Sequence, residues 1–347
     1  MKHFMVMVIG FVFLFCTSGI AAEKNKDSVI ELKYAGFLSE HTWIPQNAII
    51  PWEKEIEAAT NGRVKVVHYG SQTLCKGPDA WEATKTGVAD ITWLVPGYTP
   101  GMFPVSDVMS LPLLPIPNSK AAAGIHWQLY EKFPEIAKQF KDVKLLMFFN
   151  CGPRQIYTTK KAGVIKHLAD FRGLKLRALG GPTAKFLANA GSAAVAVGTG
   201  DIYSALERGI IDGLIMDSNG LSTYSIGDVT ENINTYPLIY PPMAIIMNLK
   251  KWNNLPSDIQ EAIMSISGRE GSEKLGKRAY DDHLAGPFTD DVKKHNINVY
   301  TLNTEEIKEW ESAASKQWDS WIAQMKSSGV DGQKILDELL RLAKTYK

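Results

Sequence analysis

Arg177 is the residue best placed by type and spacing to bind a small anion in this chain of 347 residues. The alternation in 174–177 (LKLR) predicts a strand whose leucines share one face, with Arg177 ending the strand on the other. Carboxyl ends of strands in open α/β sheets border the ligand crevice. A glycine turn and a helix start follow at 180–183 (GGPT), which would add free backbone N–H groups. A forked guanidinium there suits a carboxylate, although a surface salt bridge is an equal alternative.

Two more charged residues lie where a ligand held between two lobes could touch them. Arg154 follows Gly152-Pro153, which break the pattern between two series of elements, although a solvated arginine is the simpler interpretation. Asp217 ends the predicted strand 211–216, the topological counterpart of the strand that carries Arg177. Its carboxylate could accept a ligand amine or hydroxyl, orient Arg177, or only cap a helix, because the stretch 217–219 (DSN) is typical of capping.

A glycine turn at 198–203 (GTGDIY) follows a predicted strand and opens a predicted helix, as a dinucleotide-binding turn does. Tyr203 occupies the third glycine position, where its bulk would hinder close packing of the helix on the strand. An exported oxidoreductase that uses the turn from Gly198 to Gly200 is therefore the alternative from another functional class. We instead take Thr199 as a candidate ligand contact.

Aromatic residues lie near strand ends in the first half of the chain. Trp43 follows the first predicted strand, Trp93 ends the third, and Tyr98 lies in the loop after it. These three are candidates to line an apolar crevice. Core or loop packing is the alternative for each of them, and it is the interpretation we favour for Trp81 on its helix.

Strands and helices alternate along the chain and must position these residues. Strands are predicted over 29–35, 63–69, 88–93, 143–149, 155–159, 174–178, 193–197 and 211–216. The helices between them are predicted over 49–59, 78–86, 119–133, 183–190 and 201–208. The stretch 96–117 holds six prolines and indicates a packed loop. This alternation predicts βαβ units and mostly parallel sheets.

The last third of the chain is predicted to be helical. A long helical pattern runs from Pro256 to about Ala285, and helices over 304–326 and 331–346 follow a strand at 297–301. The chain crosses between lobes at the break 150–153 and again within the proline-rich stretch 235–242. We expect lobe I to comprise residues 28–151 plus 241–281, and lobe II residues 152–240 plus 282–347, with a pocket at their interface.

Composition excludes several classes of function. The content of 45% hydrophobic and 22% charged residues is ordinary for a soluble globular protein. A formal charge of +1 without a basic stripe argues against nucleic-acid binding. Neither zinc-ligand spacing nor a G-x-S-x-G nucleophile elbow occurs, and no carboxylate pair is singled out. We therefore predict no metal, no cofactor and no catalytic residue.

The N-terminus has the three parts of a secretory signal peptide. Lys2 and His3 precede an apolar run, and small residues lead to Ala22. We expect residues 1–22 to be cleaved, with an uncleaved membrane anchor as the alternative, and the mature protein to be soluble in the periplasm. Export leaves Cys75 and Cys151 in an oxidising compartment, where they either form a disulfide or remain separate thiols, the interpretation we favour.

A series of short motifs recurs in a fixed order along the chain. They are 58–64 (AATNGRV), 87–91 (GVADI), 103–104 (FP), 111–112 (LP), 154–155 (RQ), 173–177 (GLKLR), 203–206 (YSAL) and 211–213 (IDG). In this order and spacing the chain resembles the solute receptors of tripartite ATP-independent periplasmic (TRAP) transporters, the dicarboxylate-binding-receptor family. The resemblance covers nearly the whole mature chain.

The resemblance implies roles for the candidate residues. It implies that Arg177 forms the main ion pair with a ligand carboxylate, that Arg154 assists, and that Met216 contacts the rest of the ligand. Members that bind sugar acids or dicarboxylates tend to carry a polar residue at the latter position, and the next one, Asp217 here, is usually proline. Together with the tryptophans, these departures favour an aromatic or otherwise apolar monocarboxylate over a C4-dicarboxylate or sugar acid.

The resemblance also implies a fold and a mechanism. The expected fold is the periplasmic-binding-protein fold, two α/β lobes joined by hinge strands, with the long helix 256–285 packed across both. Carboxylate binding would close the lobes, and the closed monomer would dock on the membrane permease subunits. A sensor receptor that signals to a membrane kinase is a further alternative.

Overall fold

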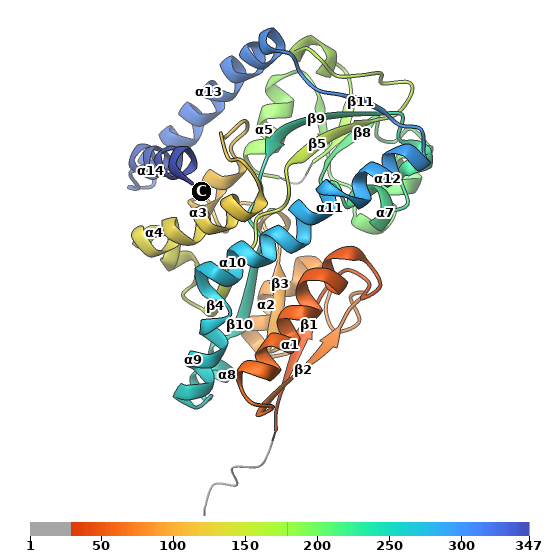
Figure 1. The fold of residues 1–347 in the computed structure, drawn as a ribbon. Coiled ribbons are helices and arrows are strands. Elements are labelled where there is room, and N and C mark those ends of the chain that lie inside the picture. Colours follow the sequence, from red (N-terminus) through yellow and green to blue (C-terminus); the bar gives the residue numbers. More distant parts are fainter. Residues whose placement is uncertain (1–28, 179, 347) are drawn as a thin grey trace, which may run out of the picture.

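The protein is seen in a computed structural model that describes residues 29–178 and 180–346. The predicted signal peptide, 1–22, lies outside the described residues. Two β-sheets with flanking helices form the two lobes, which occupy the lower and upper halves of Figure 1. The predicted two-lobed α/β fold is therefore confirmed.

Sheet A forms the centre of lobe I, with strand order β2-β1-β3-β10-β4. Its strands are β1 (Ile30–Ala35), β2 (Val64–Tyr69), β3 (Ile91–Leu94), β4 (Val143–Phe148) and β10 (Ala244–Asn248). β1 is parallel to β2 and β3, whereas β10 is antiparallel to β3 and β4. The helices α1 (Ile50–Ala59), α2 (Ala80–Thr86), α3 (Ser119–Lys132) and α8 (Leu249–Asn253) pack on these strands, and α4 (Pro134–Ala137) follows α3.

Sheet B forms the centre of lobe II, with strand order β11-β9-β5-β8-β6-β7. Its strands are β5 (Arg154–Thr158), β6 (Lys175–Arg177), β7 (Ala193–Val195), β8 (Gly213–Met216), β9 (Asn232–Ile239) and β11 (Asn298–Tyr300). The helices α5 (Pro182–Asn189), α6 (Ile202–Glu207) and α7 (Gly220–Thr223) connect them. β6 is parallel to β7 and β8, whereas β5 is antiparallel to β8 and β9.

Both sheets are mostly parallel, as predicted, and each contains one antiparallel strand. The antiparallel strands are β5 and β10, the first strand that the chain forms after each passage between the lobes. A strand that enters a sheet from the other lobe begins at the edge where the parallel strands end, and therefore runs against them. This direction places the first residue of β5, Arg154, at the carboxyl edge of sheet B.

The two passages between the lobes are hydrogen-bonded to each other. The N–H of Phe149 donates to the carbonyl of Met243 at 3.0 Å, and the N–H of Cys151 donates to that of Pro241 at 2.9 Å. The side-chain amide of Asn150 donates to the carbonyl of Tyr240 at 3.0 Å. The segments 149–153 and 240–243 thus form a two-stranded connection, the element about which the lobes can rotate.

A run of helical segments passes from lobe I to lobe II, as Figure 1 shows for α9 to α12. The segments are α9 (Ser257–Ser265), α10 (Gly268–Gly276), a π-helical turn (Lys277–Asp281), α11 (Asp282–Ala285) and α12 (Pro287–Lys294). The predicted single helix from Pro256 is interrupted before α10, where Gly268 has a φ of +58°. The part that spans both lobes is α10 to α11, which packs on α3 and accepts a hydrogen bond from Asn219 of lobe II at the Ala279 carbonyl.

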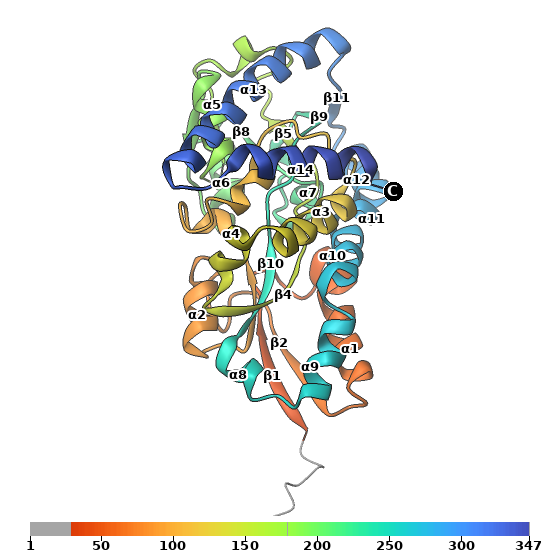
Figure 2. The same ribbon diagram turned by 90° about the vertical axis from the view of Figure 1, so that its left-hand side faces the viewer.

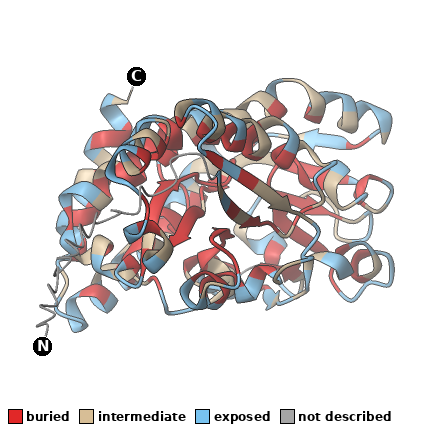
Figure 3. Cartoon of the chain, turned by 90° about the horizontal axis from the view of Figure 1, so that it is seen from below, coloured by how far each residue is buried: buried red, intermediate tan, exposed pale blue. Residues whose placement is uncertain are grey.

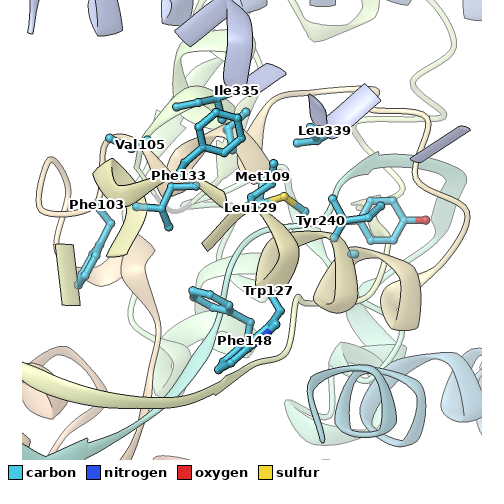
Figure 4. Packing of buried hydrophobic residues seen from close by; sticks show 14 of the residues in the cluster. Phe103, Val105, Met109, Trp127, Leu129, Phe133, Phe148, Tyr240, Ile335 and Leu339 are labelled. Carbon is cyan, nitrogen blue, oxygen red and sulfur yellow. The ribbon is translucent and has the colours of Figure 1, made fainter. Parts of the chain in front are cut away.

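The C-terminal helices contact the cores of both lobes. α13 (Thr304–Ser327) begins with Asn303 and Glu306 in a capping box, its Trp310 packs in the core of lobe II, and its Trp321 packs in that of lobe I. α14 (Gly332–Thr345) lies across α3 in Figure 2, and its Ile335 meets Phe133 in Figure 4. The division into lobe I (28–151 plus 241–281) and lobe II (152–240 plus 282–347) remains a proposal.

Buried residues concentrate on the strands and on the helix faces turned toward them (Figure 3). Cys151 is buried, Cys75 is partly buried, and the two remain free thiols. Among residues 29–178 and 180–346, no group of His, Cys, Asp or Glu is arranged to hold a metal ion. Within the same residues, no helix is both long and apolar enough to cross a membrane.

The lobes also meet beside the connection, where the loop after β3 faces the start of α5. Asp107 of lobe I lies next to Gly181, the residue before α5, and Pro100 lies next to Gly180. Burial raises the pKa of Asp107 to about 6, although Lys185 on α5 acts against this shift. An Asp with a raised pKa stabilises the folded protein at low pH, and that contribution is lost as the pH rises through about 6.

We therefore predict that Asp107→Asn flattens part of the pH dependence of stability. Between pH 4 and pH 7, the unfolding free energy of the wild type should fall by about 1–2 kcal/mol relative to that of the variant, after allowing for partial exposure of the carboxyl group. Urea denaturation at both pH values measures this difference. Asp142→Asn, at an exposed position, is the matched control. An equal difference at the two pH values would contradict the prediction.

Candidate functional site

The carboxyl edge of sheet B brings the predicted charged residues together. β6 and β8 are parallel, so Arg177 and Asp217, at or just after their carboxyl ends, lie at the same edge. Arg154 reaches that edge because β5 runs the other way, pairing Gln155 with Met216. The three residues are spread over 64 positions of the chain, from 154 to 217, and the sheet topology brings them together.

A pocket lies between this edge and lobe I. Its lining residues are Phe37, Leu38, Ile44, Trp93, Val95, Tyr98, Arg154, Arg177, Thr199, Met216, Asp217, Asn219, Gly220, Thr223, Tyr224, Met243 and Tyr280. Of the residues proposed from the sequence, the structure places Arg177, Arg154, Met216, Asp217, Trp93, Thr199 and Tyr98 in the pocket wall. The pocket thus unites residues of both lobes and of the π-helical turn.

Trp43 does not line the pocket. Its indole N–H donates to the carbonyl of Arg278 at 3.1 Å, and its ring packs edge-to-face on His283 at 5.2 Å. Trp43 therefore joins lobe I to the helix that spans the lobes. Trp43 lies eight residues beyond the end of β1, so the position of that strand end does not fix the position of its side chain.

Three aromatic residues of the pocket, Phe37, Tyr224 and Tyr280, were not predicted from the sequence. Phe37 follows the carboxyl end of β1, so the strand-end rule applied to Trp93 would have found it. Tyr224 ends α7, a four-residue helix without a sequence period. Tyr280 belongs to the π-helical turn, whose extra residue changes the direction in which a side chain points, and no sequence signal marked it.

Arg177 is buried without an ionic partner. Its side chain is 2% exposed, and no carboxylate of the described residues lies within 4 Å of the guanidinium. Nε donates to the carbonyl of Val197 at 2.9 Å, and the other two nitrogens have no hydrogen-bond partner among the described residues. Burial, together with the positive charge of Arg154, lowers the pKa of Arg177. The guanidinium is thus fixed at one nitrogen, and the rest of its fork can receive an anion.

Arg154 is also buried, at 6% exposure, and its contacts are weak. Its Nε lies 3.4 Å from the sulfur of Cys151, and Nη1 lies 3.4 Å from the carbonyl of Ile215. Burial acts to lower the pKa of Arg154, but Cys151 and Asp217 outweigh it and hold the pKa above its usual range. Two cations therefore face one pocket.

Asp217 is the one carboxylate in the wall of this pocket, and neutral groups hold it. The thiol of Cys151 donates to Oδ2 at 3.1 Å, and the N–H of Asn219 donates to Oδ1 at 3.1 Å. Burial raises the pKa of Cys151 to about 12, so the thiol is protonated at neutral pH. Asp217 makes no ion pair with Arg177, so it does not orient the guanidinium directly. The bond to Asn219 forms a local turn before α7, and no side chain caps that helix, so the capping role that the stretch 217–219 suggested is not seen.

Aromatic side chains form most of the remaining wall. The rings of Phe37 and Trp93 are 4.5 Å apart, and Tyr98 packs edge-on against Phe37 at 6.1 Å. The hydroxyls of Tyr98 and Tyr224, from opposite lobes, have no hydrogen-bond partner among the described residues. Burial raises the pKa of both, so they are neutral donors at physiological pH. The pocket combines an apolar wall with donors at one end, as small-ligand sites do.

A second chamber adjoins the pocket and shares Val95, Arg154 and Met243 with it. It is lined by the loop after β3, including Asp107, and by Thr183 at the start of α5. The glycine turn predicted at 198–203 forms a single 3₁₀ turn, Thr199–Asp201, followed by the six-residue α6 (Ile202–Glu207). This turn contributes Thr199 to the pocket.

Comparison with known proteins identifies the family. The family described as "Bacterial extracellular solute-binding protein, family 7" matches residues 34–324. The outer membrane transporter protein TsaT of Comamonas testosteroni is 26% identical over 306 residues, which cover 84% of this chain and 87% of TsaT.

Solved structures agree in fold. A TRAP solute-binding protein from Rhodoferax ferrireducens T118, in complex with copurified benzoate, is 25% identical with a TM-score of 0.85, over 91% of this chain and 98% of its own. A TRAP periplasmic solute-binding protein from Bordetella bronchiseptica with bound (R)-mandelate and (S)-mandelate is 25% identical with a TM-score of 0.83, over 92% of this chain and all of its own. The chain belongs to the bacterial extracellular solute-binding protein family 7, as the sequence motifs indicated.

Proposed function

We propose that this chain is the periplasmic receptor of a TRAP transporter, and that it binds an aromatic or otherwise apolar monocarboxylate between its lobes. It releases the ligand unchanged to the membrane permease subunits and acts as a monomer. The observation that carries this proposal is Arg177, which is 2% exposed and forms no ion pair with any carboxylate of residues 29–178 and 180–346. A buried charge without a partner costs several kcal/mol, and a bound carboxylate would remove that cost.

The donors around Arg177 suit one carboxylate group. Its two free nitrogens can form a bidentate pair with the carboxylate oxygens. The hydroxyls of Tyr98 and Tyr224 can donate to the same oxygens from the two lobes. A ligand held in this way joins lobe I to lobe II, which explains how binding stabilises the closed form.

The aromatic wall supports an apolar body for the ligand. Phe37, Trp93 and Tyr280 offer ring surfaces, and Met216 and Met243 offer adaptable thioether contacts. A sugar acid or a C4-dicarboxylate would leave its hydroxyls or second carboxylate against these apolar groups at a cost in desolvation. The structural neighbours that contain benzoate and mandelate bind acids of this type.

We expect tight binding of at least one aromatic monocarboxylate. Thermal shift assays with benzoate, 3-hydroxybenzoate, mandelate and phenylacetate, next to succinate and glucuronate, should raise the melting temperature only for the aromatic acids, because a ligand stabilises the state that it binds. Native mass spectrometry of the purified protein would reveal a copurified acid. Stabilisation by succinate or glucuronate alone would contradict the proposed ligand class.

Replacing the proposed carboxylate receptor should abolish most of the affinity. Arg177→Ala should weaken binding of the best aromatic acid by about 2–4 kcal/mol, because the desolvated carboxylate loses its charged partner. Isothermal titration calorimetry measures the change. Arg172→Ala, an exposed arginine five residues earlier, should bind like the wild type. Full affinity in the Arg177 variant would refute the assigned role.

The tyrosine hydroxyls should contribute less, and from both lobes. Tyr98→Phe and Tyr224→Phe should each cost about 1–2 kcal/mol of binding free energy, since each removes one hydrogen bond to a charged group. Calorimetry on the single variants, with Tyr203→Phe at an exposed site as the control, tests this expectation. Unchanged affinity in both pocket variants would exclude the hydroxyls from the carboxylate site.

A further inference from the structure

The side chains in the pocket wall carry a net positive charge. The charged side chains in its wall are Arg154, Arg177 and Asp217, and two cations with one anion leave a formal charge of +1. His283 lies nearby, bonded to Ser218, and burial lowers its pKa, so it adds no charge at neutral pH. Asp107 faces the adjoining chamber instead. One negative charge on a ligand therefore neutralises the pocket.

Asp217 is fixed in this wall. Its two oxygens accept from Cys151 and Asn219, and the hydroxyl of Tyr157 donates to its backbone carbonyl at 3.1 Å. The side chain is 7% exposed, and Cys151 comes from the connection between the lobes. These donors are neutral, so they hold the carboxylate in place without cancelling its charge. Its field acts on whatever enters the pocket, because charges interact strongly in a poorly hydrated site.

We propose, on the basis of the function proposed above, that Asp217 is the specificity-determining residue that restricts this receptor to monoanionic acids. A monoanion leaves the pocket neutral. A dianion leaves it with a net negative charge, beside a carboxylate that cannot turn away. Repulsion between like charges at a binding site is an effective way to exclude a competing ligand.

The other role open to Asp217, accepting a ligand hydroxyl or amine, fits the contacts less well. Cys151 and Asn219 already supply a donor to each oxygen. The two roles also differ in outcome. Loss of a hydroxyl acceptor would weaken 3-hydroxybenzoate relative to benzoate, whereas loss of a repulsive charge would strengthen dianions relative to monoanions.

The test compares two acids on one scaffold, benzoate and isophthalate, which carries a second carboxylate. Calorimetry at neutral pH gives the ratio of the Kd of isophthalate to the Kd of benzoate. Asp217→Asn, which keeps the shape and removes the charge, should lower this ratio by about tenfold or more. Steric differences between the acids are the same in both proteins and leave the change unaffected. A ratio unchanged within about twofold, or no binding of isophthalate to either protein, would overturn the proposal.

Cys151→Ala is the matched control, because it removes the hydrogen bond to Oδ2 and keeps the charge of Asp217. The ratio should then stay within about threefold of the wild-type value. A shift as large as that of Asp217→Asn would show that side-chain placement, rather than charge, sets the preference, and would also overturn the proposal. Failure of the proposed function differs in outcome, because the wild type would then not bind benzoate or the other aromatic acids.

Discussion

The burial of two guanidinium groups in the pocket between the lobes, without a carboxylate paired to either, is the constraint on which the rest of the structure depends. Taking a charge out of water costs several kcal/mol unless an opposite charge or good hydrogen bonds replace the lost hydration. Arg177 has one strong backbone contact, and Arg154 has two weak ones. This arrangement of the lobes therefore leaves both guanidinium groups buried without an ionic partner, and a bound anionic ligand would supply one.

The connection between the lobes carries part of the site. The segments 149–153 and 240–243 bond to each other and lead directly into β5 and β10. Arg154 is the first residue of β5, and Cys151 lies within the connection. Because Arg154 and Arg177 belong to the same sheet, a rotation of the lobes moves both of them relative to Tyr98 of lobe I. Ligand contact and hinge geometry are coupled through neighbouring backbone, which needs no long-range pathway.

Strand-end reasoning predicted much of the charged part of the site. The rule that parallel strands end at the crevice predicted the positions of Arg177 and Asp217, but it did not decide between a ligand contact and the alternatives of a surface salt bridge or a helix cap. Arg154 follows a break in the sequence pattern. Its position at the same edge depends on the antiparallel direction of β5, which cannot be predicted from the sequence. Tyr280 needed the π-helical turn, where one inserted residue decides which face a side chain takes.

The strands near the second passage were missed for a different reason. β9 contains Pro237, and prolines at 241 and 242 precede β10, so the stretch resembled a loop. Proline is tolerated in β9 because the ladder with β5 is irregular between Arg154 and Ile156, and β11 pairs only with the first residues of β9. The backbone N–H that proline lacks is therefore not needed there. An irregular pairing between strands that are distant in the sequence cannot be recognised from the residues of either strand.

The neutral donors to Asp217 explain why the two arginines stay available to a ligand. If Asp217 paired with either guanidinium, the closed pocket would be satisfied without a ligand, and an empty receptor would close as readily as a loaded one. Cys151 and Asn219 occupy the carboxylate oxygens instead, and the protonated thiol does so without adding charge. The negative charge of Asp217 then acts on any ligand in the pocket. The two arginines stay unpaired until a ligand carboxylate forms the ion pair that stabilises the closed form.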